Sequence, residues 1–120
     1  GAIVVASFHD FEGTPGDEQL AEVLAAMNYA GADVLKFACM ATSATDAARV
    51  IGAQAWAREA YDRPVIGIAM GPSGAPTRLV GSALGCAATF ATLPGSEGSA
   101  PGQFTIEQVR TVLDIIEAQR

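Results

Sequence analysis

The segment VLKFACM, residues 34–40, places one lysine inside a run of apolar residues. Its length and its branched and aromatic content are typical of a buried β-strand. A lysine in such a strand has three options: it reaches water along its stem, pairs with a carboxylate, or gives up its proton, because burial disfavours the charged form. The segment therefore predicts a buried strand and raises the question of what Lys36 does in it.

Short apolar segments on either side of this one predict three more strands, at residues 2–7, 65–70 and 87–91. Longer amphipathic segments separate them and predict helices, which gives the order β-α-β-α-β-α-β-α. Strands without clean polar alternation, joined by helices, indicate a parallel sheet covered on at least one face. Four such units fit either half of a (β/α)8 barrel or a small open flavodoxin-like sheet.

Capping residues mark where the helices begin. Thr14 is expected to cap a helix that has Pro15 at its first position and ends at Gly31. Thr42 or Ser43 is expected to cap a second helix that runs to about residue 61. Residues 71–76 are expected to form a loop, followed by a short helix over 77–84. The last helix starts from Thr105, which forms a capping box with Gln108.

The composition favours a single globular domain over residues 1–120. Half of the residues are hydrophobic, and the net charge of −6 argues against nucleic acid as a partner. We expect no membrane partner, because no apolar run is long enough to span a bilayer and the start of the chain lacks the pattern of a signal peptide. Cys39 and Cys86 both lie in apolar runs, so we expect buried thiols in a reducing cytoplasm.

Reactive side chains follow the predicted strands. His9 and Asp10 come after the first strand, Lys36 lies in the second, and Arg78 starts the helix after the third. Because the carboxyl ends of parallel strands meet at one edge, we expect these side chains to converge. A neutral lysine amine attacks carbonyls to form an imine, and a nearby histidine can move the protons that this chemistry requires. An arginine can hold a substrate carboxylate.

Simpler interpretations of each residue stay open at this point. Lys36 could extend to solvent at a sheet edge. His9 could be a structural residue hydrogen-bonded beside Asp10, and Arg78 could be a surface charge. The GPSG segment at residues 71–74 lacks the spacing of a phosphate-binding loop, so it carries little weight.

Taken together, the motifs resemble the carboxyl-terminal half of type I 3-dehydroquinate dehydratase, a (β/α)8 barrel enzyme of the shikimate pathway of aromatic amino acid biosynthesis. The resemblance covers the whole chain in order, and it rests on SFHDFEGTP (7–15), VLKFACM (34–40), RPVIGIAMGPSG (63–74), TRLVGSALGCAATFA (77–91) and SAPGQFTIEQVRTVLDII (99–116). It implies a lyase that dehydrates 3-dehydroquinate to 3-dehydroshikimate through a lysine imine, without a metal or other cofactor.

The resemblance also assigns roles to individual residues. Lys36 matches the lysine that forms the Schiff base, and His9 matches the general acid and base. The remaining matches are substrate-binding residues: Arg78 for the carboxylate, Ser99 and Gln103 for hydroxyl groups, and Met70 and Phe90 for the apolar wall.

The chain supplies only four of the eight strands that such a barrel needs. The resemblance places the glutamate that orients the catalytic histidine in the other half. We therefore expect a homodimer or a complementary half-barrel to complete the pocket. Two alternatives remain: a non-catalytic half-barrel module that needs a partner for activity, and another lysine Schiff-base enzyme such as a small aldolase.

Overall fold

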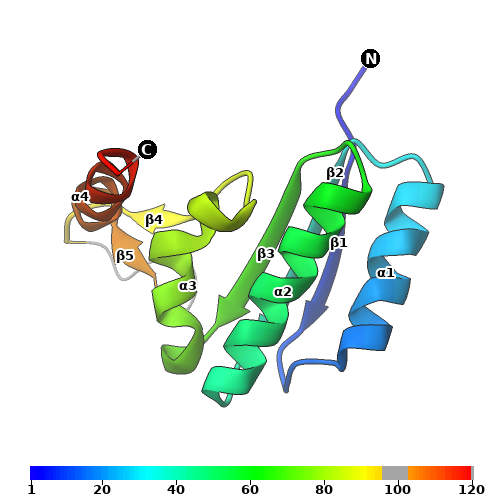
Figure 1. Ribbon diagram of the computed structural model, residues 1–120, viewed down its shortest axis with the longest axis horizontal. Coiled ribbons are helices and arrows are strands. Elements are labelled where there is room, and N and C mark those ends of the chain that lie inside the picture. Colours follow the sequence, from blue (N-terminus) through cyan, green and yellow to red (C-terminus); the bar gives the residue numbers. More distant parts are fainter. Residues whose placement is uncertain (96–102, 120) are drawn as a thin grey trace.

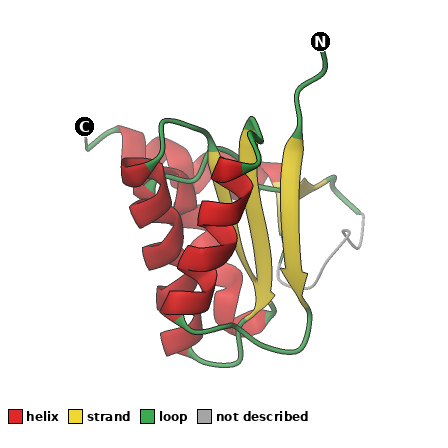
Figure 2. Ribbon diagram, turned by 90° about the vertical axis from the view of Figure 1, so that its right-hand side faces the viewer, coloured by secondary structure: helices red, strands yellow, loops and turns green. Residues whose placement is uncertain are grey.

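A three-stranded parallel sheet forms the centre of the computed structural model, which describes residues 1–95 and 103–119. Its strands are β1 (Val5–Asp10), β2 (Val34–Met40) and β3 (Val65–Met70), in that spatial order. Helices α1 (Asp17–Tyr29) and α2 (Ala44–Ala60) connect them and cover one face (Figure 1). Figure 2 shows the helices on one side of the strands.

The strands β2 and β3 have the predicted bounds, but the prediction for β1 was wrong by three residues at each end. The ladder begins where Val5 lies opposite Val34, the first residue of β2. The Val4 carbonyl still accepts hydrogen bonds from the amides of Asp33 and Val34. Residues 2–4 are nevertheless not part of the paired strand, although their side chains are typical of strands.

The strand predicted at residues 87–91 is the largest difference. Ala87 makes one backbone hydrogen bond to Val65, with 2.8 Å between nitrogen and oxygen, and the ladder goes no further. A two-residue strand, β4 (Ala91–Thr92), instead pairs in parallel with β5 (Phe104–Thr105) in a separate small sheet. Alanine has a weak preference for strands, and within this segment only Ala91 pairs with a described strand, which is β5.

Residues 71–76, expected to be a loop, are mostly helical. They form the 3-10 turn η1 (Pro72–Gly74) and the start of α3 (Ala75–Val80), and a second 3-10 turn, η2 (Gly81–Leu84), follows. Gly71 makes the sharp turn out of β3 with a φ of 86°, a conformation that glycine adopts without strain. Proline is tolerated in a first helical turn because its missing N–H needs no partner there.

The helix caps confirm part of the prediction. Ser43 accepts a hydrogen bond from the Asp46 amide at the start of α2, and Thr105 and Gln108 form the expected capping box on α4 (Ile106–Glu117). The cap proposed at Thr14 was wrong, because α1 starts at Asp17 after Gly16. The Thr14 hydroxyl instead donates to the carbonyl of Met40, at 2.8 Å.

Alternation along β2 separates the core from the opposite face of the sheet. Leu35, Phe37 and Cys39 are fully buried in the cluster formed with α1 and α2. Their helix partners include Leu20, Leu24 and Val50. The residues between them face the other way, where Ala38 packs with Ile68 and Met70 in a second, smaller cluster. Lys36 therefore belongs to the face that the helices leave open.

The two cysteines differ in burial. Cys39 is fully buried, and burial together with the charge of Asp10 raises the pKa of its thiol to about 12. Cys86 is only partly buried, so the expectation of a buried thiol was wrong there. It follows η2, in the segment that the strand ladder does not hold.

We therefore expect iodoacetamide to modify Cys86 and spare Cys39 in the native protein at pH 8, because only the thiolate reacts and Cys39 stays protonated and enclosed. Peptide mapping by mass spectrometry measures the modified fraction of each. Labelling in guanidinium chloride is the control, where both should react. Equal labelling in the native protein would contradict the burial of Cys39.

A buried glutamine joins α2 to β3. Gln54 has no exposed surface, its Oε1 accepts from the Gly67 amide at 3.1 Å, and its Nε2 donates to the Gly81 carbonyl at 3.4 Å. A side chain at Gly67 would meet Gln54 Oε1 at 2.7 Å, so the glycine leaves room for this contact.

Replacing this side chain by one of similar length, Gln54→Met, leaves the Gly67 amide without a partner. We expect the free energy of unfolding to fall by about 1–3 kcal/mol, measured by urea denaturation. The matched control is Gln19→Met on the exposed side of α1, where the change should stay within about 0.5 kcal/mol. Equal effects at the two positions would show that the buried contact contributes nothing.

Candidate active site

A cavity of about 210 Å³ lies on the open face of the sheet. Every predicted site residue that the structure describes lines it: His9, Lys36, Met70, Arg78, Phe90 and Gln103. Ser99 lies outside the described residues. The cavity thus collects side chains from all three strands, from α3 and from the segments that flank β4 and β5.

Lys36 points into this cavity from the middle of the sheet. Its strand has β1 on one side and β3 on the other, so the lysine does not extend past a sheet edge. Its Nζ lies 4.8 Å from the centroid of the Phe90 ring, a cation–π distance. It makes no ion pair within the described part of the chain. Within these residues, Lys36 therefore does not offset its burial by pairing with a carboxylate.

His9 lies on the same face of the sheet as Lys36. It pairs in register with Ala38, two residues beyond Lys36 on β2. Its side chain is exposed, and its imidazole stacks on Phe11 with 5.7 Å between ring centroids and 9° between ring planes. Lys36 and His9, the predicted nucleophile and base, thus lie on neighbouring strands at the rim of one cavity.

Asp10 does not hold His9. Its Oδ1 accepts hydrogen bonds from the amides of Glu12 and Gly13, at 3.0 and 3.1 Å. Adjacent residues of a strand point to opposite faces, so the carboxylate leaves β1 on the side away from the imidazole. The interpretation of His9 as a structural residue hydrogen-bonded to Asp10 is therefore wrong.

Arg78 is the most constrained polar group of the cavity. Its side chain is only 6% exposed, so the interpretation as a surface charge was wrong. Its Nε has no hydrogen-bond partner among the described residues. Burial lowers the pKa of the guanidinium. A buried donor without a partner is unfavourable, and a bound carboxylate would relieve this by accepting hydrogen bonds.

Phe11 lines the cavity although the sequence did not single it out. It is 67% exposed and lies one residue past the end of β1. A large aromatic residue two positions after a histidine, at the end of a strand, was the available signal, since such rims form binding sites in parallel α/β folds.

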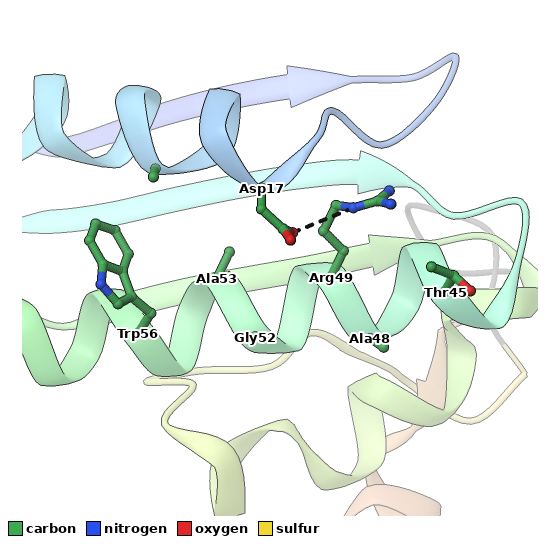
Figure 3. A pocket seen from close by; sticks show the side chains of 8 residues that line it. Asp17, Thr45, Ala48, Arg49, Gly52, Ala53 and Trp56 are labelled. Atoms are coloured by element: carbon green, nitrogen blue, oxygen red, sulfur yellow. Dashed lines mark ion pairs between the residues drawn. The ribbon is translucent and has the colours of Figure 1, made fainter.

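A larger hollow of about 600 Å³ lies between α1 and α2, away from these groups (Figure 3). Small side chains line most of it, with Trp56 at one end and the Asp17–Arg49 ion pair at the other. The ion pair has 3.5 Å between nitrogen and oxygen, and Asp17 is largely exposed, so it contributes little to stability. None of the predicted site residues lines this hollow, so the smaller cavity is the candidate active site.

Within residues 1–95 and 103–119, no three His, Cys, Asp or Glu side chains converge closely enough to hold a metal ion. None of the helices in these ranges combines the length and the apolar character needed to cross a membrane.

Comparison with curated proteins gives the family. The family model described as Type I 3-dehydroquinase matches residues 1–120. The 3-dehydroquinate dehydratases of Aromatoleum aromaticum and Listeria welshimeri are 40% and 39% identical to this chain over 114 and 116 residues. These alignments cover 95% and 97% of the chain but only 43% and 45% of the relatives. The chain therefore spans less than half of their length.

Solved structures of the same family are similar to this chain. The 3-dehydroquinate dehydratase of Geobacillus kaustophilus matches with a TM-score of 0.89 at 43% identity, over 95% of this chain and 44% of that one. The type I enzyme of Clostridium difficile, solved with covalently modified comenic acid, matches with a TM-score of 0.86 at 32% identity, over 97% and 45%. These matches support a half-barrel over an open flavodoxin-like sheet. The location in the carboxyl-terminal half stays a prediction. The chain belongs to the type I 3-dehydroquinase family, and its fold is that of a part of the family's TIM barrel.

Proposed function

We propose that the polypeptide containing this chain dehydrates 3-dehydroquinate to 3-dehydroshikimate, with this chain supplying the nucleophile and the proton-transfer group. The observation that carries the proposal is the cavity shared by Lys36, His9 and Arg78. Imine chemistry on a ketone acid needs an amine, an acid–base group and a carboxylate-binding group within reach of one small molecule. The cavity supplies one of each.

The proposed reaction begins with attack of Lys36 Nζ on the ketone carbon, and loss of water gives an imine. The protonated imine withdraws electrons, so His9, as the general base, takes a proton from the adjacent carbon. The hydroxyl on the next carbon then departs as water, with His9 donating the proton. Hydrolysis of the imine returns the lysine, and the net change is the loss of one water without oxidation or reduction.

The other side chains hold the substrate in this scheme. Arg78 binds the carboxylate through its buried guanidinium, and Gln103 and Ser99 bind hydroxyl groups. Met70 and Phe90 form apolar walls that limit water around the imine. The Phe90 ring beside Nζ favours a cation there, which suits a protonated imine as well as an ammonium.

Closure of the pocket is the part that this chain does not supply. Ile3, Val4 and Val5 are 77%, 56% and 50% exposed at the start of the chain, and β1 pairs only with β2 among the described strands. An edge strand with exposed apolar residues is suited to pair with further chain. We infer that a complementary half-barrel or a second copy of this chain covers this edge and completes the site.

The same open edge supports a second candidate, a half-barrel module that is inactive until its partner half binds. Without that half, His9 stays exposed and the cavity admits water, which weakens each electrostatic interaction in it. A reducing cytoplasm is the compartment we propose, and the free thiols of Cys39 and Cys86 support it.

Reduction with borohydride tests the imine directly. Lys36 is the only lysine in the chain, so an adduct on its peptide is assigned without ambiguity. We expect 3-dehydroquinate and borohydride to add a stable mass to that peptide in the native polypeptide and to add none in Lys36→Met.

The experiment is run on the 120-residue chain as well as on the polypeptide that contains it. An adduct only in the longer polypeptide would favour the module that needs its partner half. No adduct in either one would overturn the proposed function.

The buried arginine gives a prediction with opposite effects on activity and stability. Arg78→Met should raise KM for 3-dehydroquinate by about 10- to 100-fold, since a charge-assisted hydrogen bond contributes about 1.5–3 kcal/mol. It should also raise the free energy of unfolding, because a desolvated cation is replaced by an apolar side chain. Steady-state kinetics and urea denaturation measure the two.

Arg110→Met, at an exposed position of α4, is the matched control and should leave both quantities near those of the native protein. An unchanged KM in Arg78→Met would remove the carboxylate-binding role of Arg78.

A further inference from the structure

His9 lacks the restraints that a group moving protons requires. Its side chain is exposed near the end of β1, and its ring makes no hydrogen bond among the described residues. A general acid or base must be held within hydrogen-bond reach of the atom it serves. An unrestrained imidazole would instead sample several rotamers. A contact within the described residues that limits this freedom would help to place the imidazole.

The stacked ring of Phe11 is the contact that does so. The two rings are nearly parallel, at 9°, with their centroids 5.7 Å apart, and both line the cavity. Phe11 is itself 67% exposed, so packing in the core does not fix its position. The backbone that carries Phe11 must therefore be held by other means.

Asp10 and Thr14 hold that backbone at its two ends. The Asp10 carboxylate accepts from the amides of Glu12 and Gly13, which closes a turn around Phe11. The Thr14 hydroxyl donates to the carbonyl of Met40, at 2.8 Å, and ties the far end of the turn to the end of β2. Phe11 lies between these two attachments.

We propose that Asp10 is a positioning residue for His9, since its carboxylate folds residues 10–13 into the turn that lays the Phe11 ring against the imidazole. The inference rests on the proposed function for its effect on catalysis, but the geometry is independent of it. Asp10 acts here through an acceptor oxygen and not through its charge on His9. Asparagine retains that oxygen and alanine does not, so the two substitutions separate the two roles.

The test compares Asp10→Ala, Asp10→Asn and Phe11→Leu in the polypeptide that contains this chain. One readout is the NMR chemical shift of the His9 ring protons, assigned by their absence in His9→Gln. A neighbouring aromatic ring displaces these shifts, so we expect the displacement to vanish in Asp10→Ala and Phe11→Leu and to persist in Asp10→Asn. The Phe11 variant leaves the turn intact, so it keeps the test decisive if Asp10→Ala unfolds.

The second readout is steady-state kinetics with 3-dehydroquinate. We expect kcat to fall by about 10- to 100-fold in Asp10→Ala, because a misplaced catalytic group costs about that much, while KM changes less. Asp10→Asn should recover most of this loss. Glu12→Gln is the control for a charge change in the same turn, because the Glu12 side chain makes no hydrogen bond or ion pair within residues 1–95 and 103–119, and this variant should behave as the native protein.

Two outcomes would overturn the inference. Native His9 shifts and native kcat in a folded Asp10→Ala would overturn the inference. So would an Asp10→Asn variant that keeps the stack but loses activity as Asp10→Ala does, since the charge would then be what matters. If the native polypeptide is inactive, the proposed function fails, and the ring-proton shifts alone still decide whether Asp10 sets the His9–Phe11 geometry.

Discussion

The position of β2 between two parallel neighbours governs the rest of the molecule. Its hydrogen bonds to β1 and β3 fix its register on both sides. That register buries Leu35, Phe37 and Cys39 beneath the helices and turns Lys36 to the open face. A slip by one residue would exchange the two sets, burying the ammonium and exposing the core. The packing that stabilises the sheet is therefore also what presents the lysine.

The site is built from groups that the fold leaves incompletely satisfied. Arg78 is buried with its Nε unpaired in the described part of the chain, and His9 is exposed and restrained by one stacked ring. Such groups reduce the stability of a free protein and gain partners when a ligand binds. The core on the helix side, by contrast, is closely packed and apolar. The apolar core that stabilises the fold and the candidate site residues thus lie on opposite faces of one sheet.

This chain corresponds to only part of the family's barrel, and its candidate site is open. The chain matches less than half of its relatives' length, and the sheet ends at β1 with exposed apolar residues beside it. The residues that we propose for nucleophilic attack, proton transfer and carboxylate binding lie on one continuous part of the barrel, so their relative geometry is set within this chain. We propose that exclusion of water depends on contacts beyond it.

Local features could be predicted from the sequence. The bounds of β2 and β3, the cap at Ser43 and the capping box at Thr105 were correct, since each depends on the preferences of neighbouring residues. The ordered motifs also predicted the family. Of the site, the sequence alone identified the residue types and their placement at strand ends, because parallel strands bring those ends together whatever the details of packing.

Features that need a distant partner were decided by the tertiary structure. The Thr14 hydroxyl was predicted as a helix cap but donates to the Met40 carbonyl, because α1 starts only at Asp17 and the end of β2 lies within hydrogen-bond reach of Thr14. Residues 87–91 were predicted as a strand, but among the described residues only Ala91 lies in one, β4, which pairs with β5 and not with β3. The burial of Arg78 likewise depends on segments far apart in the chain. The stacking of Phe11 on His9 depends on the folded turn at residues 10–13. A sequence records which groups are available, and only the packed chain determines which of them meet.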